Sequence, residues 1–149
     1  MDVIVFTRPD GGTTVVIPAY NDRIGGKKRG ESQEAYLAYV AKKSIPDDAT
    51  NIHICDDSAI PQDRTFRNAW EQGVNKVPEV SMPKARVLHM DRIRLARNTA
   101  LAVLDIETMK GRDVQAEKQV LRDIPQTFDL SSATTPEALK ALIPDGLEM

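Results

Sequence analysis

Two short runs of β-branched residues open the chain and predict a β-hairpin. Residues 3–7 and 13–18 have the composition of strands, and the sequence Arg-Pro-Asp-Gly-Gly at 8–12 lies between them. Proline presets φ for a turn, and the Asp-Gly-Gly that follows tolerates positive φ. The chain is therefore expected to begin as two connected antiparallel strands.

A helix and a third strand are expected next. Ser32 is a suitable N-cap, and apolar positions recur after it at helical spacing. This helix should end near Ser44, because the residue before Pro46 avoids the α region. Residues 51–56 again have the composition of a strand. Residues 1–60 thus predict a small ββαβ unit with a helix across one face of its sheet.

The second half of the chain predicts helices. A long helix of about 28 residues, roughly 40 Å in length, is expected between its cap at Ser81 and Gly111. A second helix at 113–123 would return antiparallel to it. A short helix near 136–142 ends before Pro144. The predicted fold class is α+β, with a ββαβ domain at 1–60, a linker at 61–80, a helical hairpin at 81–125 and a tail with a short helix at 126–149.

The segment at 61–80 lacks periodicity but concentrates aromatic and basic side chains. Phe66 and Trp70, the only tryptophan, are flanked by Arg64 and Arg67. Two interpretations stay open. The aromatic side chains, four positions apart, dock a helical turn on the core, or together with the arginines they contact a partner protein.

The overall charge of −2 does not point to nucleic acid or to an anionic membrane. A local excess of cations nevertheless lies at 84–97. Three interpretations remain for it: a solvated face with local ion pairs, a protein interface, or a nucleic-acid surface. The arginines concerned are Arg86, Arg92, Arg94 and Arg97.

No recognisable catalytic or metal-binding spacing occurs. The single cysteine, Cys55, is expected to be a small buried residue, His53 a solvent-facing strand residue, and Asp56 with Asp57 a turn. The glycine-rich stretch at 25–30 lacks the spacing of a phosphate loop and is interpreted as a solvated loop. We therefore expect no enzyme activity, cofactor, metal, small-molecule substrate or membrane span.

Two stretches resemble a known family. Residues 82–105, which include Asp91-Arg92-Ile93-Arg94, are followed by residues 118–125, which include Leu-Arg-Asp-Ile at 121–124. Together they are similar to the C-terminal segment of the tail-fibre assembly proteins and tail assembly chaperones of tailed phages. That family commonly has a tryptophan and a tyrosine before Leu-Arg-Asp, where this chain has Glu-Lys-Gln. Residues 7–12 and 63–70 also resemble segments of small uncharacterised proteins encoded among phage tail genes.

The resemblance implies a protein-binding role in a bacteriophage tail. The chain would be a fibre or baseplate component, or an assembly factor, made in the host cytoplasm and found in the virion tail among multiple copies of tail proteins. Alternatives are a head–tail or capsid accessory protein, and a small nucleic-acid-binding regulator that uses residues 84–97. The candidate interface residues are Arg64, Phe66, Arg67, Trp70, Arg86, Arg92, Arg94 and Arg97.

Overall fold

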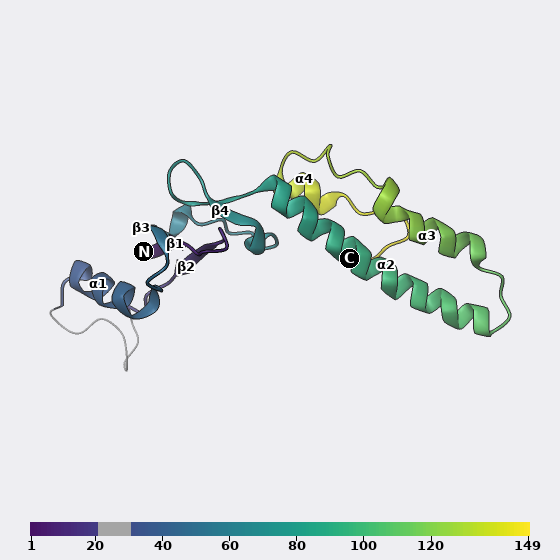
Figure 1. Ribbon diagram of the computed structural model, residues 1–149, viewed down its shortest axis with the longest axis horizontal. Coiled ribbons are helices and arrows are strands. Elements are labelled where there is room, and N and C mark those ends of the chain that lie inside the picture. Colours follow the sequence, from purple (N-terminus) through teal and green to yellow (C-terminus); the bar gives the residue numbers. More distant parts are fainter. Residues whose placement is uncertain (21–30) are drawn as a thin grey trace. The chain divides into compact units, whose positions relative to one another are not determined.

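The structure is a computed structural model that describes residues 1–20 and 31–149. The chain folds into two compact units, Met1–Ser81 and Met82–Met149, and each is described by itself. The first holds all the strands that are described and the second is helical, which confirms the α+β class (Figure 1). The loop predicted at 25–30 lies outside the described residues.

The predicted hairpin forms the centre of unit 1. In its turn, the amide of Arg8 donates to the carbonyl oxygen of Gly12 over 2.8 Å, and Gly11 adopts the positive φ of 77° that the sequence anticipates. The strands form an antiparallel sheet in the order β2-β1-β3. Their bounds are β1 Asp2–Thr7, β2 Thr13–Val16 and β3 Thr50–Asp56.

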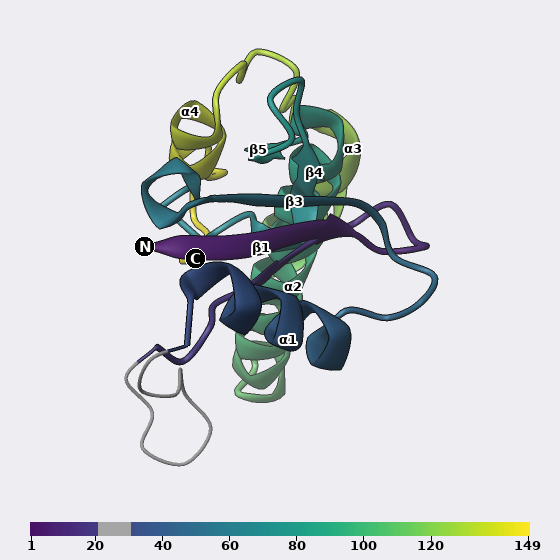
Figure 2. The same ribbon diagram turned by 90° about the vertical axis from the view of Figure 1, so that its left-hand side faces the viewer.

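Helix α1, Gln33–Ser44, covers one face of this sheet (Figure 2). The hydroxyl of Ser32 accepts from the amide of Ala35 over 3.1 Å, which confirms the predicted cap. Apolar α1 side chains then pack on Ile4 of β1. The alternation of a strand turns the neighbours of Ile4 to the opposite face, where Val3 and Val5 lie in a separate cluster.

That second face is covered by the segment predicted to be a linker, and this prediction was wrong. Residues 61–80 belong to unit 1, where β4, Trp70–Gln72, pairs antiparallel with β5, Pro78–Val80. Trp70 packs with Val3, Val5 and Ile60. The sequence did not reveal this sheet because strands of three residues are too short to show a periodic pattern. Two 3-10 turns, Asp57–Ala59 and Arg67–Ala69, complete the unit.

Strand β3 exposes residues that its pattern would bury. Ile52 and Ile54 are 54% and 48% exposed, whereas His53 is half-buried and pairs across the sheet with Val5. The expectation of a solvent-facing His53 was therefore wrong. The physical reason is that β3 is an edge strand of this sheet, and the α1 residues that bury Ile4 leave Ile52 and Ile54 half-exposed.

Unit 2 is built on a 28-residue helix, α2, Met82–Met109. It ends before Gly111, whose φ of 87° suits the predicted helix end. Helix α3, Gln115–Thr127, returns antiparallel along it (Figure 1). Helix α4, Pro136–Ala141, is capped by the Thr135 hydroxyl, which accepts from the Ala138 amide over 3.2 Å.

The segment at 126–149 is an integral part of unit 2, and its description as a tail was wrong. Helix α4 packs against α2. Leu130, Ala133, Leu139 and Leu147 are buried. Helix α3 has 13 residues and α2 has 28, so α3 packs against only part of α2. The segment at 126–149 packs against another part.

Lys118 is a buried charge that links α3 to α2. It is 5% exposed, and its ammonium group lies 2.9 Å from Asp105 Oδ1 and donates to the Thr108 hydroxyl over 2.7 Å. The carboxylate of Asp105 is largely exposed. The aliphatic stem of Lys118 thus contributes to packing, while its buried ammonium group is paired with a carboxylate that lies at the surface.

We expect Lys118→Ala to lower the free energy of unfolding of unit 2 by about 1–2 kcal/mol, through loss of its buried stem and ion pair. Lys110→Ala is the matched control, because Lys110 also pairs with a carboxylate, Glu107, but is exposed. Thermal unfolding followed by helical circular dichroism measures both. Equal effects of the two substitutions would contradict a structural role for Lys118.

Phe66→Ala should destabilise unit 1 by about 3–5 kcal/mol, since Phe66 is 2% exposed and its removal leaves a cavity. Urea unfolding followed by the fluorescence of Trp70, the only tryptophan, reports on this unit. Val74→Ala is the control, because Val74 is 99% exposed. A loss smaller than about 1 kcal/mol would show that Phe66 is not a core residue.

Candidate interaction surfaces

An apolar groove of about 750 Å³ lies on unit 2. Its walls are the second half of α2 and the first half of α3, and the chain after α4 closes one side. Most of the lining surface is apolar. The lining residues are Ala96, Thr99, Ala100, Val103, Leu104, Glu117, Val120, Leu121, Asp145, Gly146 and Glu148.

Two valines give the groove its exposed apolar surface. Val103 of α2 is 56% exposed and Val120 of α3 is 66% exposed. Leu121 is buried, and successive helix positions point about 100° apart, so Val120 and Leu121 cannot both face the core of unit 2. Small residues, Ala96 and Ala100, lie on the α2 wall. Because these side chains are small, the backbone of another helix can approach the α2 wall closely.

The rim of the groove is acidic. Asp145 and Glu148 have no ion-pair partner among the residues that the structure describes. Glu117, the third carboxylate, accepts from Arg112 over 2.9 Å. An apolar floor beside two uncompensated carboxylates favours a ligand that is apolar on one face and basic at its edges.

No sequence motif indicated this groove, and none of the candidate interface residues lines it. The adjacency of Val120 and Leu121 was the available signal, because a helix with one apolar stripe has no use for both.

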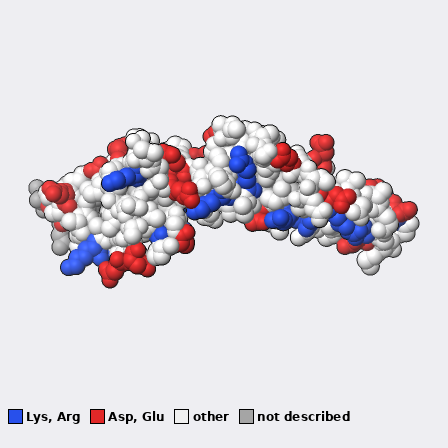
Figure 3. All heavy atoms as spheres, turned by 45° about the horizontal axis from the view of Figure 1, so that its top comes forward, with Lys and Arg blue, Asp and Glu red and all other residues white. Residues whose placement is uncertain are grey.

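The arginines of α2 form local contacts. Arg86 Nη2 donates to the carbonyl oxygen of Ala133 over 2.8 Å, and Arg94 Nη1 lies 2.8 Å from Asp91 Oδ1. On the face drawn in Figure 3, Lys and Arg side chains of the described residues are interspersed with Asp and Glu. Arg97 pairs with the neighbouring Asn98, and Arg92 is exposed. Of the three interpretations, this arrangement favours a solvated face with local pairs.

Phe66 and Trp70 lie in the core of unit 1, each 2% exposed. A partner cannot touch either side chain while this unit is folded. The docking interpretation therefore applies to them, although the turn that precedes Trp70 is a 3-10 turn rather than an α-helical one. Arg64 and Arg67, by contrast, are exposed.

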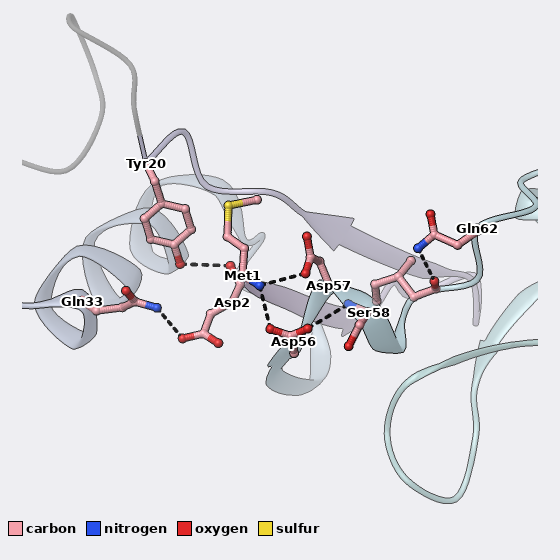
Figure 4. A network of polar contacts seen from close by, with 9 residues as sticks. Met1, Asp2, Tyr20, Gln33, Asp56, Asp57, Ser58 and Gln62 are labelled. Atoms are coloured by element: carbon pink, nitrogen blue, oxygen red, sulfur yellow. Dashed lines mark hydrogen bonds and ion pairs between the residues drawn. The ribbon is translucent and has the colours of Figure 1, made fainter.

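The adjacent carboxylates of Asp56 and Asp57 hold the amino group of Met1 (Figure 4). The amino nitrogen donates to Asp56 Oδ2 over 2.6 Å and to Asp57 Oδ1 over 2.8 Å. Asp56 also accepts from the amide of Ser58 over 3.0 Å, which is the turn-forming role predicted for this pair. The two carboxylates are therefore engaged in fixing the end of β1 against the end of β3.

These contacts shift the pKa values of both groups. Hydrogen bonds to Asp56 and then to Asp57 raise the pKa of the Met1 amino group from 8.0 to about 10. The hydrogen bond from the same amino group lowers the pKa of the Asp56 carboxyl below its usual 3.8. The ion pair therefore stabilises unit 1 fully at pH values between 3.8 and 8.0, the ordinary pKa values of the carboxyl and amino groups. Its contribution falls as pH rises through about 10 or drops well into the acid range.

Asp56→Asn should return the pKa of the Met1 amino group from about 10 toward 8.0, because the largest cause of the shift is removed. Competitive acetylation across a pH series, read by mass spectrometry, measures this value because only the neutral amine reacts. Asp47→Asn, which changes an exposed carboxylate outside this network, should leave it unchanged. An amino group that titrates near 8 in the unsubstituted protein would contradict the network.

In residues 1–20 and 31–149, the other reactive side chains, Cys55 and His89, do not form part of a catalytic or metal site. Cys55 is a free, half-buried thiol whose pKa is raised by burial, so the less reactive protonated form is favoured. His89 is buried in unit 2, and its Nε2 lies 2.8 Å from the carbonyl oxygen of Leu142. Among the described residues, no group of three or more His, Cys, Asp and Glu side chains has a metal-binding arrangement.

Comparisons with known proteins add no relative. No protein-family model matches the chain, and neither the curated proteins nor the solved structures contain a match. Within residues 1–20 and 31–149, no helix combines the length and the apolar character needed to span a membrane.

Proposed function

We propose that this protein is a non-enzymatic module that binds other proteins of a bacteriophage tail, as a fibre or baseplate component or as an assembly factor. Two observations support the proposal together. The stretches at 82–105 and 118–125 resemble tail assembly proteins, and the same stretches form the two helical walls of the apolar groove. The groove carries the proposal, because it supplies a surface on which such binding would occur.

The occupant that fits the groove is an amphipathic helix of a tail protein. Helices bind grooves of this kind through apolar residues that recur every three or four positions. Val103 and Val120 provide apolar contact from the two walls, and Ala96 and Ala100 leave space for a helix backbone. Asp145 and Glu148 at the rim favour lysines or arginines beside the apolar stripe of the bound helix.

The groove variants Val103→Asp and Val120→Asp should reduce incorporation into particles at least about tenfold, because each places a charge in the apolar contact. Val87→Asp is the matched control, since Val87 is a 61% exposed valine of α2 that does not line the groove. Mass spectrometry of purified, DNase-treated virions, with peptide intensities compared with those of tail-tube and portal proteins, measures incorporation. Circular dichroism verifies that the variants remain folded.

An assembly factor would be absent from the finished particle, so tail intermediates from infected cells are examined in the same way. Equal recovery of all three variants with tails would contradict the groove as the binding surface. Recovery of the protein with purified heads alone would contradict the tail assignment and favour the head–tail alternative.

A further inference from the structure

We propose that a pocket in unit 1 binds a small oxyanion, either phosphate or a carboxylate group. The pocket has a volume of about 170 Å³ and lies where the β1–β2 turn meets the 3-10 turn before β4. Residues about sixty positions apart form its wall, and most of its surface is polar. The side chains used in the argument are Arg8, Thr13, Thr14, Arg67, Asn68 and Trp70.

Two buried donors in this wall lack a hydrogen-bond partner. Thr13 is 7% exposed and Trp70 is 2% exposed. Thr13 Oγ1 and Trp70 Nε1 have no partner among the described residues. Buried polar groups are almost always paired, because an unpaired one loses its hydrogen bonds to water without replacement. Two such donors beside one pocket favour an acceptor there, which reaches them after a small displacement of the atoms that now cover Oγ1 and Nε1.

Two guanidinium groups at the mouth specify a negative charge. Arg67, in the 3-10 turn, and Arg8, in the hairpin turn, both line the pocket and are exposed. The guanidinium of Arg8 lies against Gly12, where a Cβ atom would collide with Arg8 Nη2. No carboxylate is among the lining residues. The planar donor fork of arginine matches the oxygens of phosphate and of carboxylate.

Asp10 sets the resting position of Arg8. Its Oδ1 accepts from Arg8 Nε and its Oδ2 lies near Arg8 Nη2, both at 3.2 Å. Oδ1 also accepts from the amide of Gly12 over 2.8 Å, so Asp10 shapes the turn as well. The Asp10 carboxylate therefore competes with a bound anion for Arg8, while Arg67 has no such competitor in the pocket wall.

The volume limits the ligand. At about 30 Å³ for each water molecule of the liquid, the pocket holds about five or six waters. Sites for drug-sized molecules are larger, about 300–1,000 Å³. The pocket thus accommodates an oxyanion group itself, either free or at the end of a larger molecule. It lies in unit 1, whereas the groove lies in unit 2, so failure of either proposal leaves the other standing.

The indole of Trp70 is a direct reporter, because the chain has one tryptophan and so one indole N–H signal in a two-dimensional ¹H–¹⁵N spectrum. Addition of inorganic phosphate to the whole protein should shift this signal saturably, with the proton moving downfield as Nε1 gains an acceptor. Sodium acetate provides the carboxylate arm, and sodium chloride at matched ionic strength is the ionic control. Tighter binding of phosphate would identify a phosphate site, and tighter binding of acetate would identify a carboxylate site.

Three variants localise the effect. Arg67→Gln should weaken anion binding at least tenfold. Asp10→Asn should strengthen it several-fold, because the side-chain oxygen that accepts from the Gly12 amide is kept while the competing charge is removed. Arg64→Gln removes an exposed arginine outside the pocket and should change nothing.

Either of two results would overturn the proposal: an indole signal that phosphate and acetate leave unmoved at tens of millimolar, or a shift that persists equally in Arg67→Gln. The remaining amide signals verify that each variant is folded, as expected for substitutions of exposed side chains.

Discussion

The packing of α3 and α4 against helix α2 determines how much apolar surface unit 2 exposes. Twenty-eight helical residues extend about 42 Å, whereas the 13 residues of α3 and the 6 of α4 extend only about 20 Å and 9 Å. The first half of α2 buries Ala85, His89 and Ile93. Farther along, Val103, Ile106 and Met109 remain 53–87% exposed. A long helix with incomplete cover leaves apolar surface that another protein can bury, and the groove, with Val103 in its wall, is part of that surface.

In unit 1, by contrast, the central element is covered completely. Its central strand β1 is buried on both faces, with Val3, Ile4 and Val5 all fully inaccessible. Helix α1 covers one face, and the segment around Trp70 covers the other. A sheet of three short strands needs both covers to be stable, because one face alone provides too small a core. The consequence is that Phe66 and Trp70, aromatic residues of the kind found in interfaces, belong to the core, whereas Arg64, Arg67 and Asn68 beside them are exposed.

Local chemistry accounts for what the sequence predicted correctly. The Asp-Gly-Gly turn, the cap at Ser32 and the helix end at Gly111 each depend on a few neighbouring residues. What could not be predicted depends on contacts between distant segments. Strands β4 and β5 are too short to show alternation, and the burial of Leu139 and Leu147 depends on α2. The groove and the oxyanion pocket were missed for the same reason, since each combines residues from separate segments.

We propose that the groove of unit 2 meets a tail protein, and site-specific photo-cross-linking during infection tests this contact. A photoreactive amino acid replaces Val103 in one protein and Val87 in another, both exposed valines of α2. We predict a cross-link from position 103 to a single tail protein, through a segment with basic residues beside an apolar helical stripe, and none from position 87. Equal labelling from both positions, or a product from 103 that contains no tail protein, would show that the groove is not the surface that binds the tail.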